Sequence, residues 1–209
     1  MLTCRNFGLV CICLVGLMSP VLLAHTRGIV QFTCPIDNHE FSAHQDFSGT
    51  SFGARLDFKR LGPIAQPQAL ADCPNCHFVI YEDHIAEDVI EKLKPYVLSE
   101  EYQKYAEMPS YYRAAKLFEF NKECYSSIGW FYLQASWQCE EETELNRKCL
   151  SASLEAYKKA LAELKDEEDQ LITKYLLIEI CRRLGEFDQA MENVAKMPDE
   201  YPTKLAWMY

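Results

Sequence analysis

Basic residues are in short supply in this sequence. It has 21 Lys and Arg against 31 Asp and Glu, a formal net charge of −10. Proteins that bind nucleic acid or anionic membrane surfaces usually present a basic patch. The charge balance therefore argues against both kinds of partner. Aromatic residues make up 12% of the chain, which predicts a folded core and not a disordered chain.

The sequence also lacks an apolar run long enough to span a bilayer. The one candidate, residues 7–18, is shorter than the ~20 residues required. Arg5 precedes this run, and the small residue Ala24 follows it. A short charged start, a short apolar core and a small exit residue are typical of a secretory signal peptide. Residues 1–24 are therefore predicted to be cleaved off from an exported or secreted protein, and an uncleaved membrane anchor is the alternative.

Catalytic signatures are lacking as well. No histidine is followed two positions later by glutamate, which the zinc deaminase signature requires. His84 stands next to acidic residues, but its surroundings indicate the start of a helix. No nucleophile and base form a recognisable arrangement. The sequence favours a non-enzymatic protein, and a metal- or thiol-dependent enzyme is the alternative.

Cysteines, by contrast, are plentiful. Ten are present, and seven remain after residues 1–24 are removed. Exported thiols are expected to be paired, metal-bound or buried. Three of the seven belong to two knuckles that align in register, Cys34-Pro35-Ile36-Asp37 and Cys73-Pro74-Asn75-Cys76. A C-x-x-C turn directs two thiolates at one metal, and two such turns build the four-ligand site of a zinc ribbon.

The first knuckle lacks its second cysteine, and Asp37 stands in that place. Zinc accepts carboxylate oxygen, so Asp37 can complete the site. His39 and His44 are alternative fourth ligands, and loss of the site with a Cys73–Cys76 disulfide is a further alternative. The predicted ligands of a structural zinc ion are Cys34, Asp37, Cys73 and Cys76.

The second knuckle is also similar to a thioredoxin-type redox pair. Such a pair needs its first cysteine at a helix N-terminus, which lowers the thiol pKa. A β-branched and aromatic run, residues 78–81, follows instead, which disfavours redox catalysis. Asn38 and His77 come directly after the knuckles, and both residue types tolerate a positive φ. His77 is therefore predicted to be a turn residue and not a ligand.

Residues 25–83 are predicted to form a zinc-ribbon-like β module. Proline- and glycine-containing loops separate three β-favouring runs, at residues 29–33, 52–58 and 78–81. Short strands joined by such loops are typical of a small β module.

Residues 84–209 are predicted to form a helical domain, which makes the fold mainly α. Apolar spacing predicts a helix that ends near Pro95, then a long helical stretch over 111–139. A further helix after the acidic run 140–144 is expected to be capped by Thr143. Its apolar stripe consists of Leu150, Leu154, Tyr157, Leu161 and Leu164.

The last helices carry a pattern typical of tetratricopeptide repeats. Gly185 is expected to end the first helix of a pair, and the small Ala190 lets paired helices approach each other. We therefore predict tetratricopeptide-like helical hairpins. The residues of the pattern are Leu184, Gly185, Phe187, Ala190 and Pro198.

Four cysteines lie in the helical part. Cys139 and Cys149 flank the turn of one helical hairpin, so a disulfide between them is an alternative to two buried thiols. The sequence makes no prediction for Cys124 and Cys181. The acidic runs at 140–144 and 166–169 are predicted to be solvated turns.

The two knuckles, within residues 32–37 and 72–79, and the helices after them resemble a bacterial family known as domain of unknown function 2225. The resemblance covers most of the chain after residue 24. Members usually have C-P-x-C at the first knuckle, so Asp37 is a departure. The resemblance implies a bacterial source and, with the signal peptide, a periplasmic location, but no activity. We expect an exported binding or scaffold protein with a structural zinc ion and a helical surface for a protein or peptide partner.

Overall fold

The computed structural model describes residues 25–63 and 66–198, and it confirms that the fold is mainly helical. The predicted signal peptide lies outside the described residues. In the described part, seven helices follow a small β-rich region in the chain. None of the helices described is long and apolar enough to cross a membrane.

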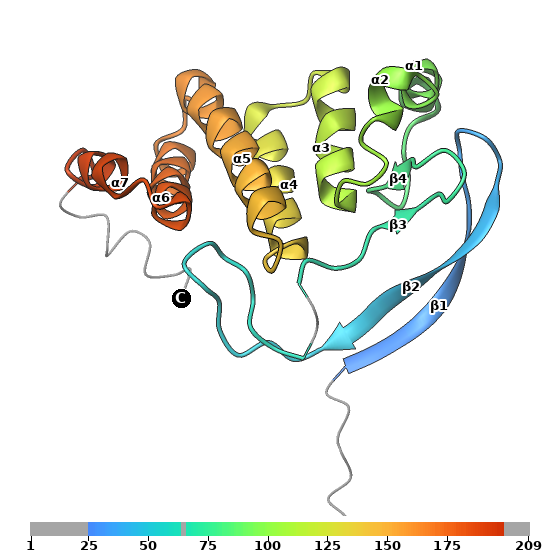
Figure 1. Ribbon diagram of the computed structural model, residues 1–209, viewed down its shortest axis with the longest axis horizontal. Coiled ribbons are helices and arrows are strands. Elements are labelled where there is room, and N and C mark those ends of the chain that lie inside the picture. The colour runs from blue at the N-terminus through green and yellow to red at the C-terminus, as the bar shows by residue number, and fades with distance from the viewer. Residues whose placement is uncertain (1–24, 64–65, 199–209) are drawn as a thin grey trace, which may run out of the picture.

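The helices stand in a row that follows the chain, from α1 and α2 beside α3 to α7 at the opposite end (Figure 1). Short connections join them, so successive long helices pack side by side. The apolar stripe predicted for α5 is largely buried against its neighbours, with Leu150, Leu154 and Tyr157 in the core. The helices are α1 Glu87–Val97, α2 Glu100–Gln103, α3 Ser110–Asn121, α4 Tyr125–Gln138, α5 Thr143–Glu163, α6 Glu167–Leu184 and α7 Phe187–Val194.

Two small antiparallel sheets form the β-rich region. In the first, β1 (His25–Thr33) pairs with β2 (Glu40–Gly49) in a long curved hairpin, visible in Figure 1. In the second, β3 (Ala71–Asp72) pairs with β4 (Val79–Ile80). The strands predicted near 29–33 and 78–81 are confirmed.

The hairpin partner β2 was missed by the sequence analysis. Phe41 is the one residue of β2 that is buried, and its ring stacks on Phe32 of β1 with the ring centroids 5.7 Å apart. Apolar residues alternate only in part along β2, at Phe41, Ala43 and Phe47, and one of them is buried, so the usual sequence signal for a half-buried strand is weak.

The strand predicted over residues 52–58 is wrong. This segment forms only an isolated bridge between Ala54 and Arg60. Phe52 is 75% exposed and Leu56 is 48% exposed, so the alternating apolar residues do not mark a buried face. Residues 51–62, here named the Asp57 loop, run past the ends of the central helices (Figure 1).

Three predicted helix boundaries also need correction. The stretch 111–139 is divided into α3 and α4, because Lys122 adopts a left-handed conformation with φ 62°. Helix α1 continues past Pro95 for two residues, since a proline removes only its own backbone donor and this one lies in the last turn. Thr143 begins α5 but does not cap it; Glu142 occupies the cap position and makes no side-chain cap bond.

Gly185 ends α6 as predicted. It is left-handed, with φ 80°, and the next N–H, of Glu186, donates to the Cys181 carbonyl at 2.9 Å. Glycine adopts this conformation without the steric cost that other residues incur. This confirms the turn of the predicted repeat pattern, while tetratricopeptide character itself stays a prediction.

One hydrophobic core joins the β-rich region to the first helices. Ile36 and Phe78, from the knuckle region, are fully buried, as are Leu93 of α1 and Leu117 of α3. The predicted division after residue 83 therefore passes through a shared core. The knuckles are held against the start of the helical row.

Candidate metal centre

The two knuckles have the same backbone geometry. In the first, the Cys34 N–H donates to the His39 carbonyl, and the Asn38 N–H donates to the Cys34 carbonyl, each at 2.9 Å. The second repeats both bonds at the same distance, from Cys73 and His77. Asn38 and His77 have φ values of 60° and 61°, so both are turn residues as predicted. The two knuckles, which align in sequence, therefore also share the same turn structure.

The four predicted ligands lie together. Their ligand atoms are all within 4.8 Å of one another, close enough to bind one metal ion. Two thiol sulfurs, of Cys34 and Cys76, are 3.5 Å apart, and the Cys73 sulfur is 3.7 Å from Asp37 Oδ1. Sulfurs bound to a tetrahedral zinc ion at about 2.3 Å lie about 3.8 Å from each other. The donor set and its spacing fit a tetrahedral ion.

The two histidines considered as alternative ligands do not join this group. Both His39 and His44 are exposed, and within the described residues neither belongs to a cluster of potential metal ligands. The backbone of His39 contributes instead, since its N–H donates to Asp37 Oδ1 at 3.1 Å. Asp37 is therefore the residue placed to complete the site.

Hydrogen bonds prepare two of the four groups to act as anionic ligands. Burial acts to raise the pKa of Asp37, but the bonds from the Asn75 amide, at 2.8 Å, and the His39 N–H outweigh it and hold this pKa well below its usual range. The hydrogen bond from the Cys76 thiol lowers the pKa of Cys34 to about 7, against the effect of burial. A carboxylate and a thiolate are thus accessible near neutral pH.

Side chains from α2 and α3 donate hydrogen bonds to the backbone of the second knuckle. The Tyr102 hydroxyl and Arg113 Nη1 both donate to the His77 carbonyl, at 3.0 and 2.9 Å. Gln103 Nε2 donates to the Cys76 carbonyl at 2.9 Å. Arg113 is 4% exposed and also pairs with Asp72. These residues tie the metal centre to the start of the helical row.

Sequence analysis missed this supporting set. The partners of Tyr102, Gln103 and Arg113 are backbone carbonyls 25 to 36 positions away, which leave no trace in the local pattern. A weak signal was Arg113, a basic residue placed between aromatic residues and alanines in α3.

The geometry also disfavours thioredoxin-type chemistry at the second knuckle. Cys73 directly follows β3, and Cys76 precedes β4, so neither stands at a helix N-terminus. Burial raises the pKa of the Cys73 thiol. A reactive first cysteine needs the opposite shift.

A cluster of charges lies away from the metal centre, around the Asp57 loop. Asp57 is fully buried and accepts hydrogen bonds from Arg55, Arg183 of α6 and Trp137 of α4, at 3.0, 2.6 and 2.8 Å. Glu140 also binds Arg55. Glu140 is exposed and lies in the turn between α4 and α5, as predicted, and the loop brings Arg55 to it from 85 positions away.

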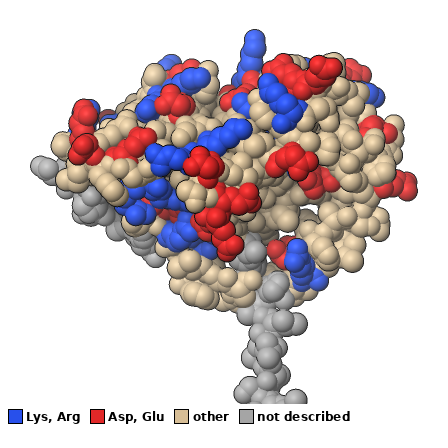
Figure 2. Space-filling model, viewed as in Figure 1, with Lys and Arg blue, Asp and Glu red and all other residues tan. Residues whose placement is uncertain are grey.

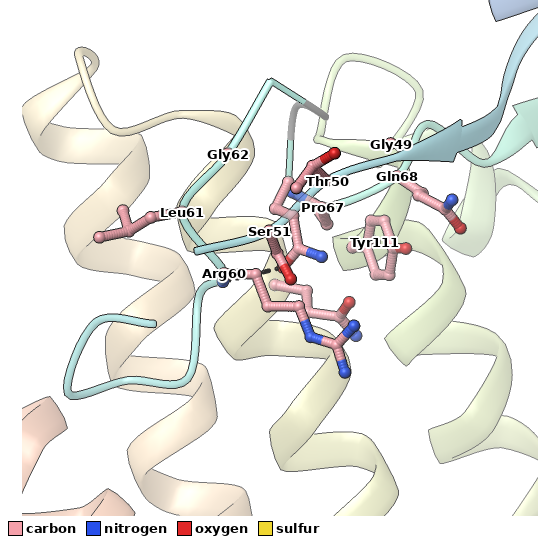
Figure 3. A pocket seen from close by; sticks show the side chains of 11 residues that line it. Gly49, Thr50, Ser51, Arg60, Leu61, Gly62, Pro67, Gln68 and Tyr111 are labelled. Atoms are coloured by element: carbon pink, nitrogen blue, oxygen red, sulfur yellow. Dashed lines mark hydrogen bonds between the residues drawn. The ribbon is translucent and has the colours of Figure 1, made fainter. Parts of the chain in front are cut away.

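A polar pocket of about 250 Å³ lies between the Asp57 loop and helices α3 and α4. Figure 3 shows Arg60 and Ser51 from the loop near Tyr111 from α3. Arg60 is the one charged residue among those that line this pocket. Its backbone N–H donates to Gln66 Oε1 at 3.1 Å. General acid–base catalysis needs a proton donor and acceptor tuned near neutral pH, and this lining does not supply such a pair.

Comparison with protein-family models, with curated proteins and with solved structures finds no match to the chain. The resemblance to domain of unknown function 2225 therefore stays a prediction.

Proposed function

We propose that this is an exported, non-catalytic binding or scaffold protein in which a structural zinc ion joins the two knuckles of the β-rich region. The convergence of four ligand atoms within 4.8 Å supports this proposal most strongly. Three of the ligands are buried cysteines. The proposed zinc ligands are Cys34, Asp37, Cys73 and Cys76.

The donor set favours zinc over other common metals. Thiolate sulfur selects zinc or other soft metals, whereas magnesium and calcium prefer sites made only of oxygen ligands. Four protein ligands fill a tetrahedral shell, which is typical of structural sites, while catalytic zinc keeps one position open. The buried thiols and their supporting hydrogen bonds are consistent with a structural role.

The far end of the helical row offers a surface for a protein or peptide partner. Phe187 and Met191 lie one turn apart on α7 and are 62% and 67% exposed, so together they give this helix an apolar face that is open to a partner. Rows of packed helices present extended surfaces to such partners. Figure 2 shows cationic and anionic side chains interspersed on the visible face, without the broad basic patch that nucleic acids require.

The alternative, a metal- or thiol-dependent enzyme, draws on the same centre. Asp37 is a harder ligand than the cysteine it replaces, and the lowered pKa of Cys34 favours a reactive thiolate. A thiol-dependent enzyme would differ from the scaffold protein in metal content and in the oxidation state of the knuckles, whereas a metal-dependent enzyme would keep an open coordination position on the metal.

Elemental mass spectrometry on the purified mature chain, with a free-thiol count on the same sample, tests the metal. We expect one zinc ion per chain, lost in Cys73→Ser because a ligand is removed. Cys124→Ser is the matched control, since Cys124 is exposed and outside the centre, and it should retain the zinc. A metal-free protein with a Cys73–Cys76 disulfide would contradict the proposal and bring redox chemistry forward.

The partner surface is tested with peptides selected from a displayed library against the zinc-loaded chain. The double variant Phe187→Ala, Met191→Ala is expected to weaken binding of the selected peptides at least about tenfold, because two exposed apolar anchors are lost. Phe52→Ala is the control, since Phe52 is equally exposed but lies on the Asp57 loop. Unchanged affinity in the double variant would exclude α7 as the binding surface.

A further inference from the structure

Two buried cysteines outside the metal centre face each other across the turn between α4 and α5. Cys139 ends α4, and Cys149 lies in the second turn of α5. Their sulfur atoms are 3.8 Å apart, and the residues are 3% and 0% exposed. Neither has a part in the zinc site, so their pairing needs its own explanation.

We propose that Cys139 and Cys149 form a disulfide that ties α4 to α5 beside their connecting turn. A disulfide needs side chains that point toward each other, with Cβ atoms about 3.5–4.5 Å apart and a final S–S bond of about 2.05 Å. The two sulfurs are already in contact, so a further approach of about 1.75 Å would bring them to the bonded distance. The residues are only 10 positions apart, so the loop they close is short.

The other cysteines of the helical row are not placed to compete. Cys124 is exposed and contacts Ser127 at 3.1 Å. Cys181 is buried in a separate hydrophobic cluster, whereas Cys139 and Cys149 share one. In the described part of the chain, this is the only pair of cysteines of the helical row whose sulfurs lie within hydrogen-bond distance.

The environment distinguishes the two thiols chemically. The hydrogen bond from Cys149 lowers the pKa of Cys139, and the same bond together with burial raises the pKa of Cys149. Thiol–disulfide exchange begins with a thiolate. In the scheme proposed here, Cys139 is the thiolate that attacks the oxidant.

The reaction consumes a disulfide oxidant, such as glutathione disulfide. The Cys139 thiolate attacks one sulfur of the oxidant, which forms a mixed disulfide and releases one glutathione thiolate. Cys149 then gives up its proton to solvent and attacks the Cys139 sulfur, which releases the second glutathione. Two protein thiols are oxidised, and one glutathione disulfide is reduced to two glutathione molecules.

The pair is separate from the metal centre, so the two proposals fail independently. In the cell, the protein meets a disulfide oxidant only if it is exported, so in this respect the inference rests on the proposed function. In a purified sample the oxidant is added, and the chemistry is tested without reference to the compartment.

Peptide mapping of the zinc-loaded full chain tests the pairing. The protein carries Cys124→Ser, because Cys124 and Cys139 otherwise share one tryptic peptide. It is treated with glutathione disulfide or with dithiothreitol, and is then unfolded and alkylated. Trypsin cuts after Arg147 and Lys148, so Cys139 and Cys149 fall in different peptides. We expect peptide 123–147 linked to peptide 149–158 in the oxidised sample and both peptides alkylated in the reduced one.

A melting comparison provides a second readout. The oxidised protein is expected to unfold at a higher temperature than the reduced protein, since a cross-link restricts the unfolded chain. In Cys139→Ser this difference should disappear. The inference is overturned if both cysteines are alkylated after oxidation, or if Cys149 is linked to a cysteine other than Cys139. Linked Cys139 and Cys149 in a protein that binds no zinc would support this inference and contradict the metal proposal alone.

Discussion

Removal of the metal, by a chelator or by Cys73→Ser, is expected to unfold the β-rich region and to lower the melting temperature sharply. Cys34, Ile36 and Phe78 are fully buried in the core that the knuckles share with the first helices. Structural zinc contributes about 10–16 kcal/mol of apparent binding free energy in small zinc domains. If only about 5 kcal/mol is lost here, the melting temperature falls by roughly 10–20 °C.

Differential scanning calorimetry and hydrogen exchange measure this effect. Backbone amides of β1 through β4 should lose protection when the metal is removed, while those of α5 and α6 should keep it longer. Unchanged melting and unchanged protection after complete chelation would rule out a structural metal.

Asp37 offers a matched variant at the same site. Asp37→Cys restores the C-P-x-C pattern, and because sulfur binds zinc more strongly than carboxylate oxygen does, it is expected to slow zinc transfer to a chelator. Asp37→Ala removes the fourth ligand and should speed that transfer. Equal transfer rates in the two variants would show that Asp37 is not a ligand.

The substitution Asp57→Ala is expected to lower the free energy of unfolding by about 3–5 kcal/mol. The carboxylate is fully buried and is the shared acceptor for Arg55, Arg183 and Trp137. Its removal leaves a largely buried guanidinium, that of Arg183, without its nearest counter-charge. Urea denaturation measures the loss.

The control for Asp57 is an exposed ion pair. Glu155 and Lys158 pair at 2.9 Å on the surface of α5, and Glu155→Gln is expected to change the free energy of unfolding by less than about 0.5 kcal/mol. A similarly small effect of Asp57→Ala would mean that the charge cluster does not stabilise the fold.

The same carboxylate gives stability a predictable pH dependence. Burial acts to raise the pKa of Asp57, but the hydrogen bond from Arg55 and the charges of Arg183 and Arg55 lower it below its usual range. A group whose folded pKa is lowered stabilises the protein above its unfolded pKa, about 3.9, and this contribution is lost as the pH falls through the folded value. Asp57→Asn should therefore lose less stability than the wild type between about pH 4 and pH 2, as urea denaturation across this range would show.

Local sequence was sufficient to predict the elements that local backbone chemistry determines. The knuckles adopt one turn geometry because Asn38 and His77 tolerate a positive φ. Gly185 ends α6 for a related reason, and the stripe of α5 follows from its spacing. Each of these features depends on residues within a few positions of one another.

The features that sequence reasoning missed depend on residues far apart in the chain. Asp57 meets Trp137 across 80 positions and Arg183 across 126, and Arg113 meets the His77 carbonyl across 36. Lys122 interrupts the helical stretch in a conformation that its residue type does not favour.

By itself, then, the sequence determined a mainly helical chain and four potential ligands in two matching turns. Only the tertiary structure decided that Asp37, and neither His39 nor His44, completes the group with the three cysteines. It also decided which helical side chains support the knuckles and where the Asp57 loop is anchored. The physical reason is that backbone preferences depend on residues that are neighbours in the sequence. Hydrogen bonds and ion pairs between distant segments form only when packing has brought those segments together.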